Sequence, residues 1–271
     1  MTPLPLIIEP DDAETLQNKN DILLVDISNV TQYAQAHIPN AVFLDYSAIV
    51  GMNKPTMGLL PSDEKMNVAM SSIGFSKNKH IVVYDEEGGG KAARLIWTLH
   101  AFGCTNISMI NGGLVSWANE GHALSNEAVQ ANKTQTNLHY ANPDVVADAD
   151  YIMSRLGADD FALLDARSLA EYDGSKAYAQ RPGHIPGAKH YEWTEGLDAT
   201  RNYRFKDKTT LQNELNQLNL NRDKETIVYC QTHHRSALSY VMLKHLGYQK
   251  VRGYQGSWSE WGNRTDTPIE H

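Results

Sequence analysis

The sequence repeats one set of motifs, and this repetition restricts the possible fold more than any other feature. Each copy holds an apolar run ending in aspartate, a His-Ile-Pro triplet, a second apolar run, and a glycine five positions before a tryptophan. The landmarks of the first copy are Asp26, His37, Asp85, Gly112 and Trp117, and those of the second are Asp165, His184, Cys230, Gly256 and Trp261. Cys230 follows Asp85 by 145 positions and Trp261 follows Trp117 by 144, so order and spacing agree. We infer an internal duplication.

Each copy alternates strand-like runs with amphipathic helical stretches. The runs are short and continuously apolar, as buried parallel strands are, and they lie at 22–26, 81–84, 163–165 and 227–229. Apolar residues recur with helical spacing in 92–99 and in 238–246. This order predicts an α/β fold in which each copy is a mainly parallel sheet flanked by helices.

An Asn-, Gln- and Ala-rich stretch without apolar periodicity separates the two copies, as is typical of a linker. We therefore predict a first domain over residues 1–124, a linker over 125–143 and a second domain over 144–271. The 271 residues are enough for two such domains.

Composition excludes several classes of protein. The 24 Lys+Arg against 32 Asp+Glu give a net charge of −8, which argues against nucleic-acid or anionic-membrane binding. No apolar run approaches the roughly 20 residues that span a bilayer, and residues 1–10 lack the layout of a signal peptide. The two cysteines, Cys104 and Cys230, are too few for a disulfide framework or a four-thiolate zinc site. We expect a cytoplasmic protein whose cysteine chemistry rests on a single thiol.

The two copies differ most in the loop after the second apolar run. The second copy reads Cys230-Gln-Thr-His-His-Arg235, whereas the first reads Asp85-Glu-Glu-Gly-Gly-Gly90. Ligands of open α/β sheets bind at this edge, where loop N–H groups and a helix N-terminus favour an anion. The thiolate form of Cys230 would be favoured there. Arg235 opposes the helix macrodipole, so we expect a negative group beside it.

Several neighbouring residues have two interpretations. Asp85 and the two glutamates after it are expected to form a solvated acidic turn, and Cys104 is expected to be inert. His233 and His234 either donate hydrogen bonds to a ligand or face solvent. Two adjacent histidines are too few to hold a metal, so we expect no metal site.

Two further groups lie near the repeated motifs. Asp165 and Arg167 follow a strand-like run, and they either orient the loop or form an internal ion pair. His37 and His184 recur in both copies, including the copy without a cysteine, which indicates an architectural role.

The sequence resembles the tandem-domain rhodaneses, a family of thiosulfate and 3-mercaptopyruvate sulfurtransferases, over essentially its whole length. The resemblance lies in the His-Ile-Pro-Gly-Ala motif at 184–188, in the Gly-Ser-Trp-Ser-Glu-Trp motif at 256–261, and in Asp85 standing where the second copy has Cys230. The Cys-Gln-Thr-His-His-Arg loop is similar to that of some bacterial thiosulfate sulfurtransferases. The family often has an arginine where this chain has Glu171, which removes one expected anion contact. Arg181 is a candidate replacement.

The resemblance implies a covalent mechanism. Cys230 would take the sulfane sulfur of thiosulfate as a persulfide and pass it to a thiophilic acceptor such as cyanide. The loop amides from Gln231 and Thr232 onward would hold the persulfide, while His233, His234 and Arg235 would bind the charged substrate. No cofactor is expected beyond the persulfide on Cys230.

Three alternatives stay open at this point. The donor is either thiosulfate or 3-mercaptopyruvate, and the dense positive charge after Cys230 favours thiosulfate. The persulfide is alternatively handed to a sulfur-accepting protein partner. A cysteine phosphatase of related fold needs five residues between cysteine and arginine, but only four separate Cys230 from Arg235.

Overall fold

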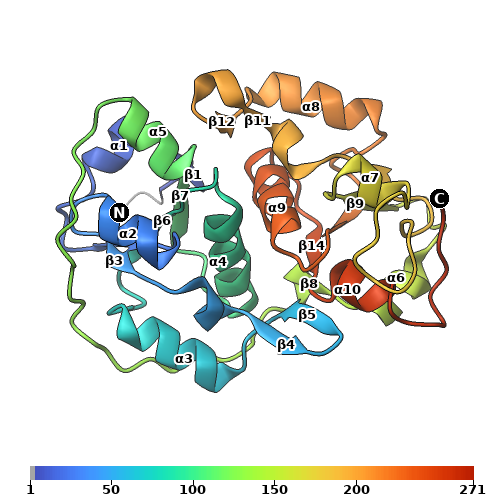
Figure 1. Ribbon diagram of the computed structural model, residues 1–271, viewed down its shortest axis with the longest axis horizontal. Helices are drawn as coiled ribbons and strands as arrows, with labels where there is room; N and C mark the ends of the chain where they lie inside the picture. The colour runs from blue at the N-terminus through green and yellow to red at the C-terminus, as the bar shows by residue number, and fades with distance from the viewer. Residues whose placement is uncertain (1–3) are drawn as a thin grey trace. The chain divides into compact units, whose positions relative to one another are not determined.

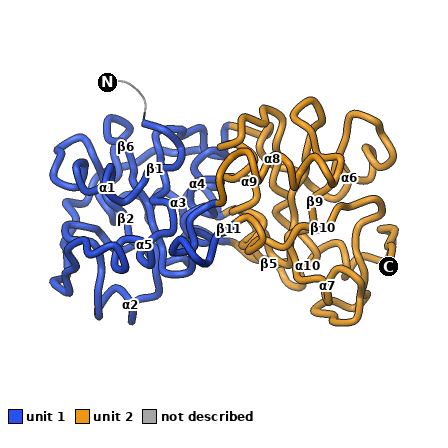
Figure 2. The backbone as a smooth tube through the Cα atoms, turned by 90° about the horizontal axis from the view of Figure 1, so that it is seen from above, with its two compact units in different colours: residues 1–50, 61–141, 197–205 blue, residues 51–60, 142–196, 206–271 orange. Residues whose placement is uncertain are grey.

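The computed structural model describes residues 4–271 and divides them into two compact units (Figure 2). Of the described residues, unit 1 contains 4–50, 61–141 and 197–205, and unit 2 contains 51–60, 142–196 and 206–271. Residues 1–3, with which the first predicted domain begins, lie outside the described residues. Two short segments, 51–60 and 197–205, thus belong to the unit opposite to their own sequence copy.

Unit 1 is an α/β unit (Figure 1). Its strands are β1 (Ile7–Ile8), β2 (Ile22–Asp26), β3 (Val42–Phe43), β6 (His80–Tyr84), β7 (Ile107–Ile110), β11 (Leu197–Asp198) and β12 (Arg204–Phe205). Its helices are α1 (Pro10–Glu14), α2 (Val30–Gln35), α3 (Asp63–Ser72), α4 (Gly90–Ala101) and α5 (Gly113–Asn119), with short 3-10 turns η1 (Tyr46–Ile49) and η4 (Ala199–Arg201).

Unit 2 repeats this organisation. Its strands are β4 (Gly51–Asn53), β5 (Thr56–Leu59), β8 (Val146–Ala147), β9 (Phe161–Asp165), β10 (Lys189–His190), β13 (Glu225–Tyr229) and β14 (Val251–Tyr254). Its helices are α6 (Ala149–Arg155), α7 (Leu169–Tyr172), α8 (Lys208–Gln217), α9 (Arg235–His245) and α10 (Ser257–Trp261), with 3-10 turns η2 (Pro143–Val145) and η3 (Trp193–Gly196).

The main sheets of the two units have the same topology. Among the described residues, each has five strands, in the orders β1-β7-β6-β2-β3 and β8-β14-β13-β9-β10, and all neighbours are parallel. The strands follow the predicted apolar runs, and the residues with helical spacing in α4 and α9 are buried. The predicted α/β class is therefore confirmed. Asp85 and Cys230 directly follow the central strands β6 and β13, so each lies at the carboxyl edge of its sheet.

The repeated histidines have the same role in both units. The imidazole of His37 stacks on Tyr33 with ring centroids 4.0 Å apart, and that of His184 stacks on Tyr172 at 3.7 Å. The Nδ1 atom of each histidine also contacts the carbonyl oxygen of the same tyrosine, at 2.6 Å and 2.9 Å. These buried contacts give both histidines the architectural role expected from their recurrence.

The stretch expected to be a linker runs along unit 1 as far as residue 141. The N–H of Thr134 donates to the carbonyl of Ser71 at 3.1 Å, and the N–H of Leu138 donates to Oδ1 of Asn67 at 2.7 Å. The main chain of this stretch is therefore bonded to residues of helix α3.

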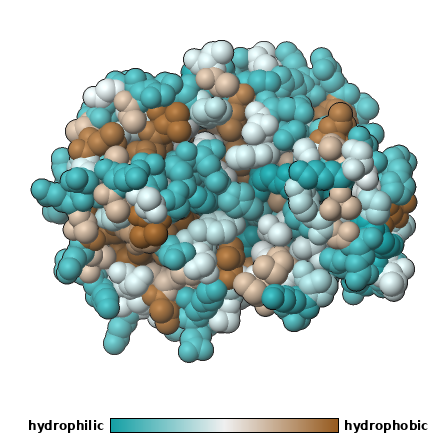
Figure 3. Space-filling view, viewed as in Figure 1, coloured by the Kyte–Doolittle hydropathy of each residue, from teal (hydrophilic) through white to brown (hydrophobic). Residues whose placement is uncertain are grey.

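Hydrophilic residues cover much of the face shown in Figure 3, with hydrophobic patches between them. Within residues 4–271, no helix is both long enough and apolar enough to cross a membrane.

Candidate active site

Cys230 lies between β13 and α9, and its side chain is fully buried. Residues of helix α10 form hydrogen bonds with both the main-chain N–H and the carbonyl of Cys230. The N–H of Cys230 donates to Oγ of Ser257 at 3.3 Å, and its carbonyl accepts the N–H of Trp258 at 2.9 Å. Ser257 has a φ of 49°, a left-handed conformation that is uncommon for residues other than glycine. The backbone of the expected nucleophile is therefore anchored by a strained turn.

Asp85 stands in the corresponding place of unit 1. Its carboxylate is fully buried and accepts N–H bonds from Glu87 at 3.0 Å, Gly89 at 2.8 Å and Ala92 at 2.9 Å. Burial, followed by the charge of Glu87, raises the pKa of Asp85 to about 6, although the amide bonds oppose this rise. The expectation of a solvated turn is thus wrong for Asp85, because amides replace water around its oxygens. The loop of unit 1 is built around an anion at the position of the nucleophile.

Arg235, the first residue of α9, binds the carboxylate of Glu171 in α7. Its Nη1 and Nη2 atoms lie 2.7 Å and 2.8 Å from the two oxygens of Glu171. Glu171 also closes a capping box with Ser168, and its side chain is only 5% exposed. Burial opposes ionisation of Glu171, but the hydrogen bonds and charge of Arg235 outweigh it and lower the pKa to about 2. The negative group expected beside Arg235 is, in the free protein, this carboxylate.

Arg235 is also within electrostatic reach of the nucleophile. Burial disfavours its charge, but the hydrogen bond to Glu171 and then the charge of Cys230 raise its pKa. Its side chain keeps 23% exposure, so solvent and small anions reach it. That the guanidinium also binds an anionic substrate stays a prediction.

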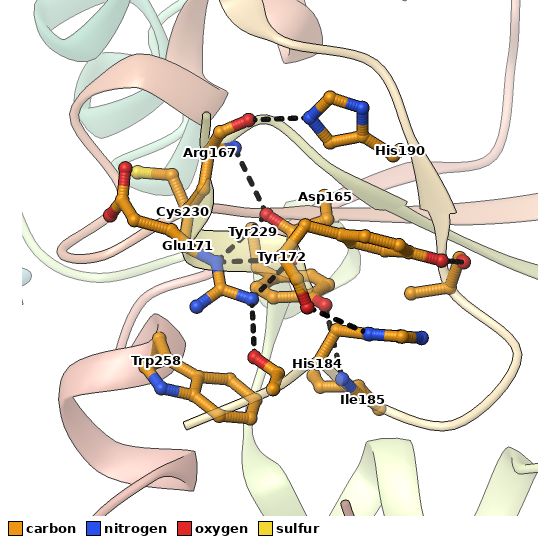
Figure 4. A network of polar contacts seen from close by, with 12 residues as sticks. Asp165, Arg167, Glu171, Tyr172, His184, Ile185, His190, Tyr229, Cys230 and Trp258 are labelled. Carbon is orange, nitrogen blue, oxygen red and sulfur yellow. Dashed lines mark hydrogen bonds and ion pairs between the residues drawn. The ribbon is translucent and has the colours of Figure 1, made fainter. Parts of the chain in front are cut away.

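Asp165 and Arg167 form a buried ion pair (Figure 4). Nη2 of Arg167 lies 2.6 Å from Oδ2 of Asp165 and donates to the carbonyl of Gly183 at 2.8 Å. The same guanidinium lies over the ring of Trp258, 4.4 Å from its centroid. Because the N–H of Trp258 holds the carbonyl of Cys230, the ion pair supports the loop indirectly, so the two interpretations left open by the sequence are compatible.

Unit 1 lacks this support. At the positions of Arg167 and Trp258 it has Ser28 and Leu114, while Asp26 keeps the aspartate. Asp26 is fully buried, and burial raises its pKa despite hydrogen bonds from Tyr84 and Ser28. The copy without the cysteine therefore also lacks the arginine and the tryptophan beside the loop.

The remaining loop residues are held by the protein itself. His233 is fully buried with a φ of 53°, and its Nδ1 lies 2.8 Å from Oγ of Ser236. His234 and Thr232 are half-buried. The carbonyl of Gln231 accepts the N–H of Ser259 at 2.9 Å, and its side-chain amide donates to the carbonyl of Tyr178 at 3.4 Å. Substrate contacts by these residues stay predictions.

Arg181 is bound to the segment that follows α10. Its Nη1 donates to the carbonyl of Thr267 at 2.8 Å, and its Nη2 donates to the carbonyl of Trp261 at 2.9 Å. These bonds do not favour the predicted role of Arg181 as a replacement anion contact, and that role stays untested.

Sequence reasoning missed Ser257 and Ser259 as supports of the loop. The sequence feature that could have identified them is the motif before Trp261 in the second copy, where Ser257 stands at the position of Gly113 in the first copy.

Within residues 4–271, no three His, Cys, Asp or Glu side chains gather as they would around a metal ion. Burial raises the pKa of Cys104, despite the charge of Lys77, which agrees with the expected inert thiol.

Comparison with known proteins identifies the family. The family described as Rhodanese-like domain matches residues 9–120 and 148–264. The chain is 42% identical over 269 residues to a thiosulfate sulfurtransferase of Azotobacter vinelandii, covering 98% of this chain and 97% of that protein. It is 33% identical over 246 residues to a 3-mercaptopyruvate sulfurtransferase of Escherichia coli K12, covering 89% and 86%. The solved structure of wild-type EanB shares the fold, with a TM-score of 0.85 at 20% identity over 98% of this chain and 69% of that one. The chain therefore belongs to the rhodanese family and carries two rhodanese-like domains in tandem.

Proposed function

We propose that this protein is a thiosulfate sulfurtransferase with Cys230 as its nucleophile. The Cys230 thiolate attacks the outer sulfur of thiosulfate, the sulfur–sulfur bond of the donor breaks, and sulfite leaves with the bonding electrons. The persulfide then gives its outer sulfur to a thiophilic acceptor, so that cyanide becomes thiocyanate and the thiolate returns. Two half-reactions on one residue are the pattern of covalent catalysis with ping-pong kinetics.

The observation that carries this proposal is the amide-bound carboxylate of Asp85 in unit 1. Thr232 and His234 of unit 2 correspond by position to Glu87 and Gly89, whose amides bind that carboxylate at 3.0 Å and 2.8 Å. We propose that the amides at these positions stabilise the persulfide anion on Cys230. Fixed N–H donors aimed at a developing negative charge are the usual means of stabilising such an intermediate.

Arg235 has the role of attracting the donor. Thiosulfate carries two negative charges and competes with Glu171 for the guanidinium. Of the two donors, 3-mercaptopyruvate has one carboxylate and a ketone, which need separate hydrogen-bond donors. The Arg235 guanidinium near Cys230 suits the compact dianion better, and the 42% identity to a thiosulfate sulfurtransferase supports this choice.

Intact-protein mass spectrometry tests the first half-reaction. Incubation with thiosulfate should add one sulfur atom to the protein, and cyanide should remove it. Cys230→Ser should gain no sulfur, whereas Cys104→Ser, the matched control, should behave like the wild type. Loss of sulfur loading in a folded Cys104→Ser variant would contradict the assignment of the nucleophile.

A thiol on a small molecule or on a partner protein satisfies the same chemistry as cyanide. We propose no cofactor beyond the persulfide, because Cys230 itself carries the transferred atom. A cytoplasmic location stays the prediction made from the two cysteines.

A further inference from the structure

A hairpin from the first sequence copy belongs to unit 2. Strands β4 and β5 pair antiparallel within residues 51–60, and Figure 1 shows this hairpin beside α10. The N–H of Met57 donates to Oγ of Ser259 at 3.0 Å, and the N–H of Leu60 donates to Oε1 of Gln255 at 3.1 Å. The hydroxyl of Ser259 also lies 3.3 Å from the carbonyl oxygen of Met57. The hairpin is therefore fastened to the helix that anchors Cys230.

Ser259 links the hairpin to the loop. Its side chain contacts Met57, while its main-chain N–H donates to the carbonyl of Gln231 at 2.9 Å. The preceding residue, Trp258, holds the carbonyl of Cys230 at the same distance, 2.9 Å. One turn of α10 thus bonds the first two residues of the loop on one side and the hairpin on the other.

Gly58 brings the hairpin into direct contact with the loop. Its φ is +75°, and a Cβ added to it would lie 1.9 Å from the carbonyl oxygen of Thr232 and 2.8 Å from the carbonyl carbon. A side chain at this position must push that carbonyl away. The peptide unit is planar, so the movement also turns the N–H of His233, which belongs to the same unit.

We propose that the hairpin is a positioning element of the reaction, with Gly58 as its contact residue. It fixes the peptide between Thr232 and His233, which lies between the amides of Thr232 and His234 proposed above to face the sulfur of Cys230, and so keeps both amides in place. The proposal rests on the proposed function, since the amides matter only if Cys230 carries a negative sulfur. The first copy then contributes to the catalysis of the second through residues far away in the sequence.

Gly58→Ala tests this, with Gly157→Ala as the matched control. Gly157 is also in unit 2 with a φ of +82°, but nothing lies within 4 Å of a Cβ added there. Both variants carry the same backbone strain, and only Gly58→Ala displaces the loop. Each is made in the Cys104→Ser background, so that iodoacetamide reports on Cys230 alone.

Gly58→Ala should lower kcat for sulfur transfer from thiosulfate to cyanide by about tenfold, equivalent to about 1.4 kcal/mol. It should slow the alkylation of Cys230 by a similar factor, because both steps need the stabilised thiolate. The KM for thiosulfate should change by less than about threefold, since Arg235 is untouched. Gly157→Ala should lose thermal stability from the shared backbone strain, but less than Gly58→Ala because its Cβ meets no neighbour, and it should keep both rates. Equal rates in the two variants would overturn the proposal.

Ser259→Ala covers the case in which Gly58→Ala does not fold. This variant keeps the N–H bond to Gln231 and loses both hydroxyl contacts with Met57, together with the hydroxyl bond to the carbonyl of Gly256 at 2.8 Å. The kcat and the alkylation rate should therefore fall together by about threefold. Unchanged rates would refute the positioning role. Alkylation needs no thiosulfate, so it still tests the hairpin if the wild type takes no sulfur and the proposed function fails.

Discussion

The pair of Arg235 and Glu171 allows a sharp test of how the donor is attracted. Glu171→Gln keeps the shape of the side chain and its place in the capping box with Ser168, because glutamine serves that position as well as glutamate. It removes one negative charge from a site that must receive a dianion. Arg235→Ala removes the cation and leaves a carboxylate that is only 5% exposed without its partner. The double variant removes both.

The expected magnitudes follow from charge and burial. One carboxylate charge at about 6 Å repels a dianion by about 1.4 kcal/mol in the dielectric of water, so Glu171→Gln should lower the KM for thiosulfate about tenfold. Arg235→Ala should lower kcat/KM by about ten- to a hundredfold, the loss of a charge-assisted contact of roughly 1.5–3 kcal/mol. It should also destabilise the protein by about 2–3 kcal/mol, below the usual cost for a fully buried pair, because Arg235 keeps 23% exposure.

Kinetics and thermal unfolding of all four proteins complete the cycle. The double variant should recover the stability that Arg235→Ala loses, since no carboxylate is left unpaired. Its kcat/KM should stay low, because the anion contact is still missing. A double variant with the kcat/KM of the wild type would show that Arg235 only neutralises Glu171, and the role of Arg235 in substrate binding would have to be abandoned.

Two further predictions concern the loop of unit 1 and the choice of donor. The pKa of Asp85 lies near 6 in the folded protein and above its ordinary value, so its contribution to stability is present below about pH 3.8 and is lost as the pH rises through 6. The melting temperature of the wild type, relative to that of Asp85→Asn, should therefore fall from pH 4 to pH 7. A difference that stays constant over this range would contradict the raised pKa. For the donor, kcat/KM should be higher with thiosulfate than with 3-mercaptopyruvate, and the thiosulfate value should fall with ionic strength because attraction at a partly exposed loop is screened. A higher value for 3-mercaptopyruvate would reverse the substrate assignment and leave Cys230 as nucleophile.

Strands and helices, which depend on residues close together in the sequence, were predictable from the sequence. The apolar run before Cys230 forms β13, and the helical pattern after it forms α9, which begins at Arg235. The repeat of these patterns was enough to infer two α/β units of the same design. Periodicity succeeds here because burial against one sheet is decided within a few residues along the chain.

Contacts between distant residues were not predictable in the same way. Glu171 was recognised as a departure from the family pattern, but its bond to Arg235 joins positions 64 apart. The approach of Gly58 to Thr232 crosses from one sequence copy to the other, and a single glycine in a short hairpin carries no signal of its partner. Asp85 was misjudged because charge alone suggests solvent, whereas three backbone amides supply the same hydrogen bonds inside the protein.

Segments 51–60 and 197–205 each belong to the unit formed mainly by the other sequence copy, and this affects how the chain folds during its synthesis on the ribosome. Unit 1 includes residues 197–205, so it cannot be completed until about half of the second copy has been translated. The hairpin at 51–60 emerges early and has no unit 2 to join until residues beyond 206 follow. At translation rates of about 5–20 residues per second, this interval lasts roughly 7–30 s. During that time the hairpin lacks the contacts with Gln255 and Ser259 that it makes in the folded protein, which makes this chain a candidate for chaperone protection during synthesis.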